Sequence, residues 1–287
     1  MSTIFELVLS NVVNGVMIGI IYAIIAMGMS LIFGVMNIKN LAHGDFAVLG
    51  MYTSYWFFTL FNIPPLLSIP LSFVIFFCVG VIFTRFLFKY VVGELLGSIL
   101  ATFGLSIVME NLMLLVWKAD FRKIIVEYGI FKAGPISVGG SNLLAFVFAV
   151  ILISLTQLFL SKTKIGIAIR AVSQDAEAAS SLGVDADRIR LIGGGLGIAL
   201  SGCGGAILAL IYHMYPYLGI QLTLYALIIC VLAGLGNVFG TLFGGIIIGI
   251  AHSVAVIYLP FALTPAVGFA LFVLILLFKP KGLFTRE

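Results

Sequence analysis

The sequence predicts an all-α protein, a polytopic transmembrane helical bundle of about 8-9 spans, and three observations lead to that fold class. Of the 287 residues, 62% are hydrophobic and 9% are charged, whereas a soluble domain carries about 25% charged residues. The apolar runs are about 18 to 25 residues long, which is the length that a helix needs to cross about 30 Å of hydrocarbon. The short alternating segments of a membrane β-barrel are missing from the sequence.

Taken in order, each expected span is an apolar run between two polar breaks. The first run lacks a basic region before it and a small-residue cleavage site after it, so we expect a retained span and not a signal peptide. Together the spans should form a single transmembrane domain over residues 1–287. They are expected near residues 8–35, 44–61, 65–88, 96–117, 143–160, 191–211, 222–237, 240–258 and 262–278.

Two long polar intervals, 118–142 and 161–190, set the expected topology. Basic residues favour the cytoplasmic side of a membrane, and they gather beside the spans that flank the second interval and in the C-terminal tail. The second interval and the C-terminus are therefore expected in the cytoplasm, and nine spans then place the N-terminus and the interval 118–142 outside. The basic residues are Lys162, Lys164, Arg170, Arg188, Arg190, Lys279, Lys281 and Arg286.

The break between the first two spans is unusually polar, with Asn40, His43 and Asp45 close together. It could be a plain hairpin at the cytoplasmic surface. Alternatively, since the first run of about 28 residues would be about 42 Å long as a helix, the break could dip into the bilayer. Transporters use broken helices of that kind to present polar groups to a solute. We predict that these three residues are structural or line a pathway, and that they are not a proton relay.

A polar stripe follows in the fourth span, where Ser98, Thr102, Ser106 and Glu110 recur at every fourth position and so share one helix face. Serine and threonine can bond their own backbone or a neighbouring helix. A carboxylate inside a span is costly and by default indicates function. The sequence leaves pathway lining and interhelical bonding as alternatives for this stripe.

The stretch "SQDAEAASSLG" within 161–190 reads as a short helix. Ser173 is its expected N-cap, Asp175 and Glu177 suit the positive end of the helix dipole, and Gly183 fits the C′ position. Its small side chains form a low surface that another protein could enclose. A solvated loop with incidental helix is the alternative.

Several functions are disfavoured by the sequence. It contains no Gly-Lys-Ser/Thr phosphate loop, so any ATP must bind to another subunit, and the chain is not expected to be an enzyme. The cysteines Cys78, Cys203 and Cys230 lack the spacing of metal ligands and are expected to be buried packing residues, with no metal site. A net charge of +4, spread over several loops, indicates membrane orientation and not a nucleic-acid partner.

Four stretches resemble the permease subunits of branched-chain amino acid ABC importers. "KIGIAIRAVSQDAEAASSLGVDADRIR" resembles that family's cytoplasmic loop, and "MSLIFGVMNIKNLAHGDFAVLGMY" resembles its motif after the first span. "LAGLGNVFGTLFGGIIIGI" and "LFKPKGLF" resemble its glycine-rich and closing segments. They occur in the expected order over nearly the whole chain.

The resemblance implies a multi-pass protein of a prokaryotic inner membrane, surrounded by membrane lipid, in an importer of branched-chain amino acids. Its partners would be a second homologous permease, identical or different, two cytoplasmic ATPase subunits that carry ATP and Mg, and an external solute-binding protein. The chain itself would bind no cofactor. The family's ATPase-docking loop maps within 161–190 as a coupling loop, with contact residues at Gly166, Arg170, Ala171, Asp175, Ala179 and Gly183.

One position departs from the family, which usually has an uncharged polar residue where this chain has Glu110. Related permeases carry urea, amides or other small polar solutes, so such a solute is the alternative substrate. A secondary transporter is a less favoured alternative, because it would need more ionisable groups inside the membrane than this chain has. A passive channel for urea or small amides is a third alternative, which a requirement for ATP would exclude.

Overall fold

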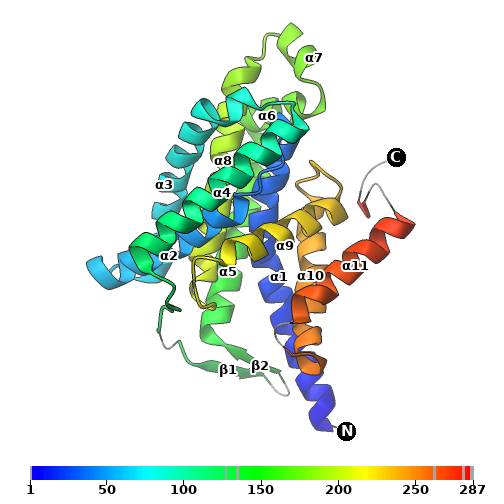
Figure 1. Ribbon diagram of the computed structural model, residues 1–287. Helices are drawn as coiled ribbons and strands as arrows, with labels where there is room; N and C mark the ends of the chain where they lie inside the picture. Colours follow the sequence, from blue (N-terminus) through cyan, green and yellow to red (C-terminus); the bar gives the residue numbers. More distant parts are fainter. Residues whose placement is uncertain (1, 127, 134–135, 261–262, 280–281, 285–287) are drawn as a thin grey trace.

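The computed structural model describes residues 2–126, 128–133, 136–260, 263–279 and 282–284. Within them the chain forms a helical bundle with one small hairpin (Figure 1). The nine long helices lie where the spans are expected, which confirms the all-α prediction. They are α1 (Ser2–Met36), α2 (His43–Phe61), α3 (Pro65–Phe86), α4 (Leu95–Trp117), α5 (Gly140–Lys162), α8 (Ala186–Leu208), α9 (Leu218–Ala233), α10 (Gly240–Tyr258) and α11 (Thr264–Phe278).

Shorter elements fill the connections. The 3-10 helix η1 (Phe88–Tyr90) joins α3 to α4, and the two helices α6 (Lys164–Gln174) and α7 (Ala176–Ser181) lie between α5 and α8. The strands β1 (Ile130–Ala133) and β2 (Ile136–Gly139) form an antiparallel hairpin between α4 and α5. The sequence reasoning anticipated neither this hairpin nor α6 as a separate helix.

Six of the helices in the described chain, namely α1, α3, α4, α5, α8 and α10, are long and apolar enough to cross a membrane. Of the others, α9 has 16 residues and α11 has 15, which gives about 24 Å of helix or less. Helix α2 has 19 residues, including a histidine and an aspartate near its start. The expected number of full spans is therefore approximate, although the bundle itself is as predicted.

Helices α1 and α8 form the centre of the bundle. Helix α8 packs on α1, α2 and α3, and α1 also packs closely on α10. Glycines allow these approaches: a Cβ at Gly205 of α8 would lie 1.8 Å from the Ala47 carbonyl oxygen in α2, and one at Gly19 of α1 would lie 2.4 Å from the Gly245 carbonyl oxygen in α10. Small residues at every fourth position thus allow the close helix contacts that hold membrane bundles together.

The two polar intervals lie at opposite ends of the molecule (Figure 1). At one end Asn142 of α5 donates a hydrogen bond to Asn14 of α1, and Asn14 donates one to the Ser137 carbonyl oxygen of β2. At the other end are α6 and α7, and the last described residues join them, because Phe284 borders the same cavity as Arg170 of α6. This relative placement is the one that the expected topology requires. Lys281 and Arg286, two of the basic residues used for that expectation, lie outside the described residues.

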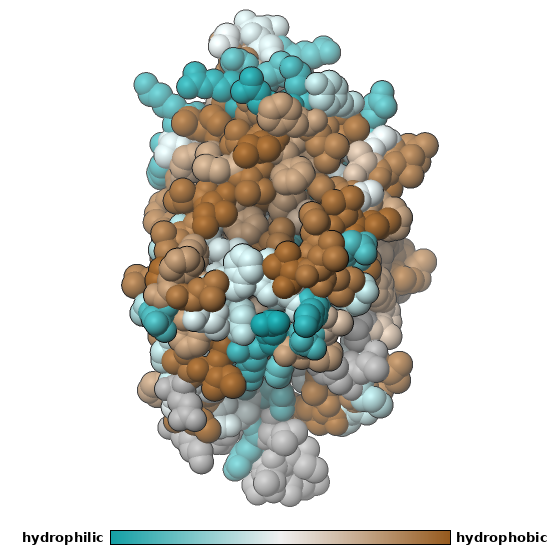
Figure 2. Space-filling view, turned by 60° about the vertical axis from the view of Figure 1, so that its left-hand side comes forward, coloured by the Kyte–Doolittle hydropathy of each residue, from teal (hydrophilic) through white to brown (hydrophobic). Residues whose placement is uncertain are grey.

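The surface is divided into a hydrophilic end and a hydrophobic band. Hydrophilic side chains cover the end that carries α6 and α7, and a predominantly hydrophobic band lies below them (Figure 2). Cys203 and Cys230 are buried as expected, but Cys78 is exposed, so the expectation that all three cysteines are buried was wrong for Cys78. Cys78 lies on α3, only 28% of whose most apolar stretch is buried inside the chain.

Candidate functional site

The break between α1 and α2 returns into the interior of the bundle. Asn37 has a left-handed backbone, with φ of 54°, and reverses the chain after α1. The Nε2 atom of His43 lies 2.8 Å from the carbonyl oxygen of Ile25, which is eleven positions before Met36, or about 16 Å along the helix. Because a carbonyl can only accept, Nε2 carries the proton in this hydrogen bond. Of the two alternatives, the structure therefore has the segment that dips inward.

Three hydroxyl groups from three helices hold this segment. The Thr102 hydroxyl of α4 accepts a hydrogen bond from the Leu41 amide at 3.1 Å. The Thr223 hydroxyl of α9 accepts one from the Gly44 amide at 2.8 Å and donates to the Leu41 carbonyl oxygen at 3.0 Å. The Ser201 hydroxyl of α8 donates to the His43 carbonyl oxygen at 2.7 Å. Irregular backbone at membrane depth is tolerated only where its polar groups find such partners.

Two side chains of the break add further hydrogen bonds. The Oδ1 atom of Asn40 accepts from the Ala42 amide at 3.1 Å and so closes a turn ahead of α2. The Asp45 carboxylate accepts from the Ser106 hydroxyl of α4 at 2.5 Å. Gly219 of α9 makes room for it, because a Cβ there would overlap Asp45 Oδ1. We call the whole cluster the central polar junction, with Asn40, His43, Asp45, Thr102, Ser106, Ser201 and Thr223 as its members.

The predicted stripe of α4 is one buried face, as its spacing indicates. Thr102 and Ser106 reach the junction, whereas the Ser98 hydroxyl bonds the Leu95 carbonyl oxygen of its own helix at 2.9 Å. Glu110 is 9% exposed, and its Oε1 atom has no hydrogen-bond partner in the described part of the chain. The bonds that Thr102 and Ser106 make across to the break are interhelical bonding, one of the two alternatives. That the stripe lines a pathway stays a prediction.

Some polar atoms of the junction are not used by these bonds. Asn40 Nδ2, His43 Nδ1 and Asp45 Oδ1 are buried without a partner among the described residues. Leaving such atoms unpaired costs free energy, so they are natural contacts for water, for a solute or for a second arrangement of the helices.

Sequence reasoning missed Ser201 and Thr223 as members of the junction. Ser201 stands at every-fourth-residue spacing with Gly193, Gly197 and Gly205, a pattern that by itself indicates only helix packing. Thr223 stands one helical turn after Gly219, with Gln221 between them. The available sequence signal was a glycine and a threonine four positions apart, which share one helix face and could pack against the polar break.

The second candidate site begins with α6, which turns tightly away from α5. Thr163 is the N-cap, and its hydroxyl accepts from the Gly166 amide at 3.0 Å. A Cβ at Gly166 would lie 2.2 Å from the Phe159 carbonyl oxygen, so glycine fits the crossing of the two helices. Arg170 on the other face is exposed and borders a cavity of about 1040 Å³ between α1, α6 and the turn after α9.

Helix α7 starts two residues later than expected. Its N-cap is Asp175, whose Oδ1 accepts from the amides of Glu177 and Ala178 at 3.0 and 2.9 Å. Ser173 was therefore wrongly expected as the cap. It belongs to α6, and its hydroxyl bonds the Arg170 carbonyl oxygen. The C′ expectation is confirmed, because Gly183 has φ of 86°, a conformation that favours glycine.

Most of α7 faces outward, since it projects beyond the bundle (Figure 1). Ala179 is buried beneath it and Ala171 of α6 is half-buried, so these two residues fix how the two short helices pack. Leu182, directly after α7, is 86% exposed. This large apolar side chain at a projecting tip was not among the expected site residues, although exposed leucines at such places commonly mark contacts with other proteins.

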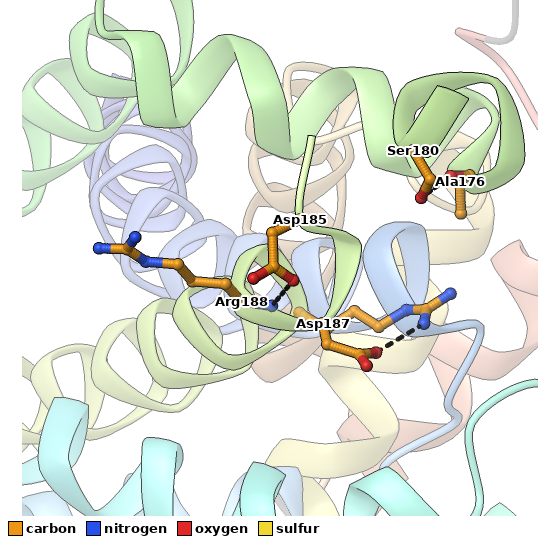
Figure 3. A network of polar contacts seen from close by, with 6 residues as sticks. Ala176, Ser180, Asp185, Asp187 and Arg188 are labelled. Atoms are coloured by element: carbon orange, nitrogen blue, oxygen red, sulfur yellow. Dashed lines mark hydrogen bonds and ion pairs between the residues drawn. The ribbon is translucent and has the colours of Figure 1, made fainter. Parts of the chain in front are cut away.

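A short capped connection joins α7 to the central helix α8. Asp185 is the N-cap of α8, and its Oδ1 accepts from the Arg188 amide at 3.0 Å (Figure 3). One turn into the helix, Asp187 pairs with Arg190 at 3.1 Å. Since α8 also carries Ser201, one continuous helix links the tip at α7 to the central polar junction.

The family described as the permease component of branched-chain amino acid transport systems matches residues 11–277. The chain is 28% identical to the high-affinity branched-chain amino acid transport system permease protein BraD of Pseudomonas aeruginosa, over 97% of this chain and 96% of BraD. It is 28% identical to the corresponding protein LivH of Escherichia coli K12, over 100% of this chain and 98% of LivH.

The probable branched-chain amino acid transport permease protein LivH of Methanocaldococcus jannaschii is 31% identical, over 82% of this chain and 77% of that protein. No solved structure matches the chain.

Proposed function

The chain belongs to the family of permease components of branched-chain amino acid transport systems, and we propose that it is the permease subunit of an ATP-driven importer of branched-chain amino acids. In this proposal it forms half of the translocation pathway in a prokaryotic inner membrane. A second, homologous permease supplies the other half, because a pathway under two ATPase subunits is most simply enclosed by two related permeases.

The observation that carries the proposal is the projecting α7. A solvated connector would need neither the Asp175 cap nor a six-residue helix held off the bundle. Capped at its start and ended by Gly183 and the exposed Leu182, α7 has the form of a small rigid knob that a partner could enclose. We propose that a cytoplasmic ATPase subunit, which carries ATP and Mg, binds this knob.

Motion would then pass from α7 into the membrane. Helix α7 rests on α6 and α8, and α8 bonds the re-entrant break through Ser201 and His43. Close packing at small residues joins α8 to α1 and α2, and we propose that α8 shifts as a rigid body when the ATPase moves α7. Such a shift would break and remake the bonds of the central polar junction, and we propose that Asn40, His43, Asp45 and Glu110 meet the solute or water in that state.

The proposal fixes the orientation of the chain. The end with α6 and α7 faces the cytoplasm, since basic residues gather there. The hairpin and the start of α1 face outside, where an external solute-binding protein would deliver the amino acid.

The test is leucine uptake into proteoliposomes that contain the permease pair, the ATPase and the binding protein. We expect Leu182→Asp to remove ATP-dependent uptake, because a charged side chain would be buried in the ATPase contact. The matched variant Leu182→Met keeps apolar volume and should retain most of the activity. Full ATP-dependent uptake by Leu182→Asp would refute the proposed dock. If urea inhibited leucine uptake and isoleucine and valine did not, the proposed substrate class would be refuted.

A further inference from the structure

A basic cavity lies at the same end of the molecule as α6 and α7 but is built from other elements. It has a volume of about 460 Å³ and lies between the end of α1, the end of α3 with η1, and the start of α8. Its lining residues are Met36, Thr84, Arg85, Lys89, Val92, Asp187, Arg190 and Leu191.

Positive charge dominates this cavity. Arg85, Lys89 and Arg190 line it, and Asp187 is the one carboxylate among the lining residues. Asp187 pairs with Arg190. Arg85 and Lys89 have no carboxylate within ion-pair distance in the described part of the chain. Three cations against one carboxylate leave a surplus of two positive charges, which suits an anionic group.

Thr84, which has a buried hydroxyl, also lines the cavity. Thr84 is 2% exposed, and its hydroxyl has no hydrogen-bond partner among the described residues. An unpaired buried hydroxyl is costly, whereas a phosphate oxygen is a strong acceptor for it.

The side chains around the cavity are of the kinds that suit the edge of a lipid bilayer. Phe86 is 68% exposed and Tyr90 is 78% exposed, on either side of Lys89 in the chain, and Leu96 at the start of α4 is also exposed. The Arg85 guanidinium carbon lies 5.9 Å from the centre of the Phe86 ring. Tyrosine beside exposed apolar side chains and basic residues is typical of the headgroup layer, where cations meet phosphates and rings meet acyl chains.

We propose that this cavity binds the phosphate of an anionic phospholipid headgroup. Basic pockets between transmembrane helices at the cytoplasmic side recognise such headgroups. Arg85 and Lys89 would contact the phosphate from α3 and η1, Arg190 would contact it from α8, and Phe86 and Tyr90 would lie along the acyl chains. A free phosphate would find the same cations but would gain nothing from the exposed rings. The bound lipid would tie the start of α8 to α3.

The test measures lipid binding to the full chain in a neutral detergent, by native mass spectrometry and by the rise in melting temperature. The probes are phosphatidylglycerol, phosphatidylcholine and inorganic phosphate. In the double variant Arg85→Gln with Lys89→Gln we expect phosphatidylglycerol to bind about 25-fold more weakly, since each cation near the headgroups contributes roughly fivefold. Both side chains are exposed, so the melting temperature without added lipid should match that of the wild type.

The matched control is Arg188→Gln, which removes a charge from the same turn of α8. The side chain of Arg188 extends to the opposite side from Asp187 and its ion pair (Figure 3), so binding should stay within about twofold of the wild type, as for most surface changes. The proposal would be overturned by wild-type phosphatidylglycerol binding in the double variant, or by equal binding of phosphatidylcholine. Equal stabilisation by inorganic phosphate would assign the cavity to a free anion. Loss of ATPase co-purification with unchanged lipid binding would assign it to a protein contact.

Discussion

Replacing Asp175 by alanine tests the cap that makes α7 a rigid knob. The carboxylate accepts hydrogen bonds from the amides of Glu177 and Ala178 at 3.0 and 2.9 Å. An alanine side chain can accept neither bond. Loss of an N-cap costs about 1 kcal/mol, within a range of about 0.5 to 2. Helix α7 has only six residues, or about 9 Å of helix, so the whole element depends on this cap.

A loss of about 1 kcal/mol raises the open fraction of α7 about fivefold. Hydrogen exchange of the α7 amides in the purified protein should therefore become about fivefold faster in Asp175→Ala, while exchange in α8 stays unchanged. Asp175→Ser keeps a capping oxygen and should stay within about twofold of the wild type. In the assembled importer we expect Asp175→Ala to hydrolyse ATP with less uptake for each ATP. Unchanged exchange in Asp175→Ala would refute the role of the cap, and unchanged coupling would refute the role of α7.

Three further predictions concern the membrane part. Thr102→Val leaves the half-buried Leu41 amide without its acceptor, and we expect a loss of about 0.5 to 1.5 kcal/mol of stability. Thr102→Ser should keep most of the stability, and equal melting temperatures for the valine variant and the wild type would contradict this. Gly205→Ala would place a Cβ 1.8 Å from a carbonyl oxygen of α2 and should destabilise the protein by about 1 to 3 kcal/mol. At Gly268 a Cβ meets nothing within 4 Å, so Gly268→Ala should be neutral or stabilising in the same thermal unfolding assay. Glu110→Gln should change the kinetics of uptake without reducing the amount of assembled complex, and unchanged kinetics with full assembly would count against a pathway role for this residue.

The membrane bundle was predictable because lipid allows so few alternatives. Every backbone group of a spanning segment must be satisfied within the chain, so a long apolar run becomes a helix whatever its neighbours are. The polar stripe from Ser98 to Glu110 was equally predictable, since residues four positions apart lie on one helix face. The position of Gly183 at C′ followed from local capping chemistry, whereas Asp175 took the cap position expected for Ser173 because α6 continues to Gln174.

The central polar junction could only be half predicted. The polarity of Asn40, His43 and Asp45 indicated a special break, but its depth depends on partners from distant helices. Thr223 lies 179 positions from Gly44 along the chain, and their hydrogen bond has no local sequence signal. The exposure of Leu182 was likewise hidden, because a leucine in a short amphiphilic stretch packs inward as easily as outward.

The most direct test of ATP-driven coupling labels α7 itself. A single cysteine at the exposed Ala178, in a Cys78→Ser background that removes the exposed native thiol, would be treated with a membrane-impermeant maleimide in inside-out and right-side-out vesicles. The account predicts labelling only in inside-out vesicles, and protection there when the ATPase subunit is bound. Labelling from the outer side, or equal labelling with and without the ATPase, would contradict it.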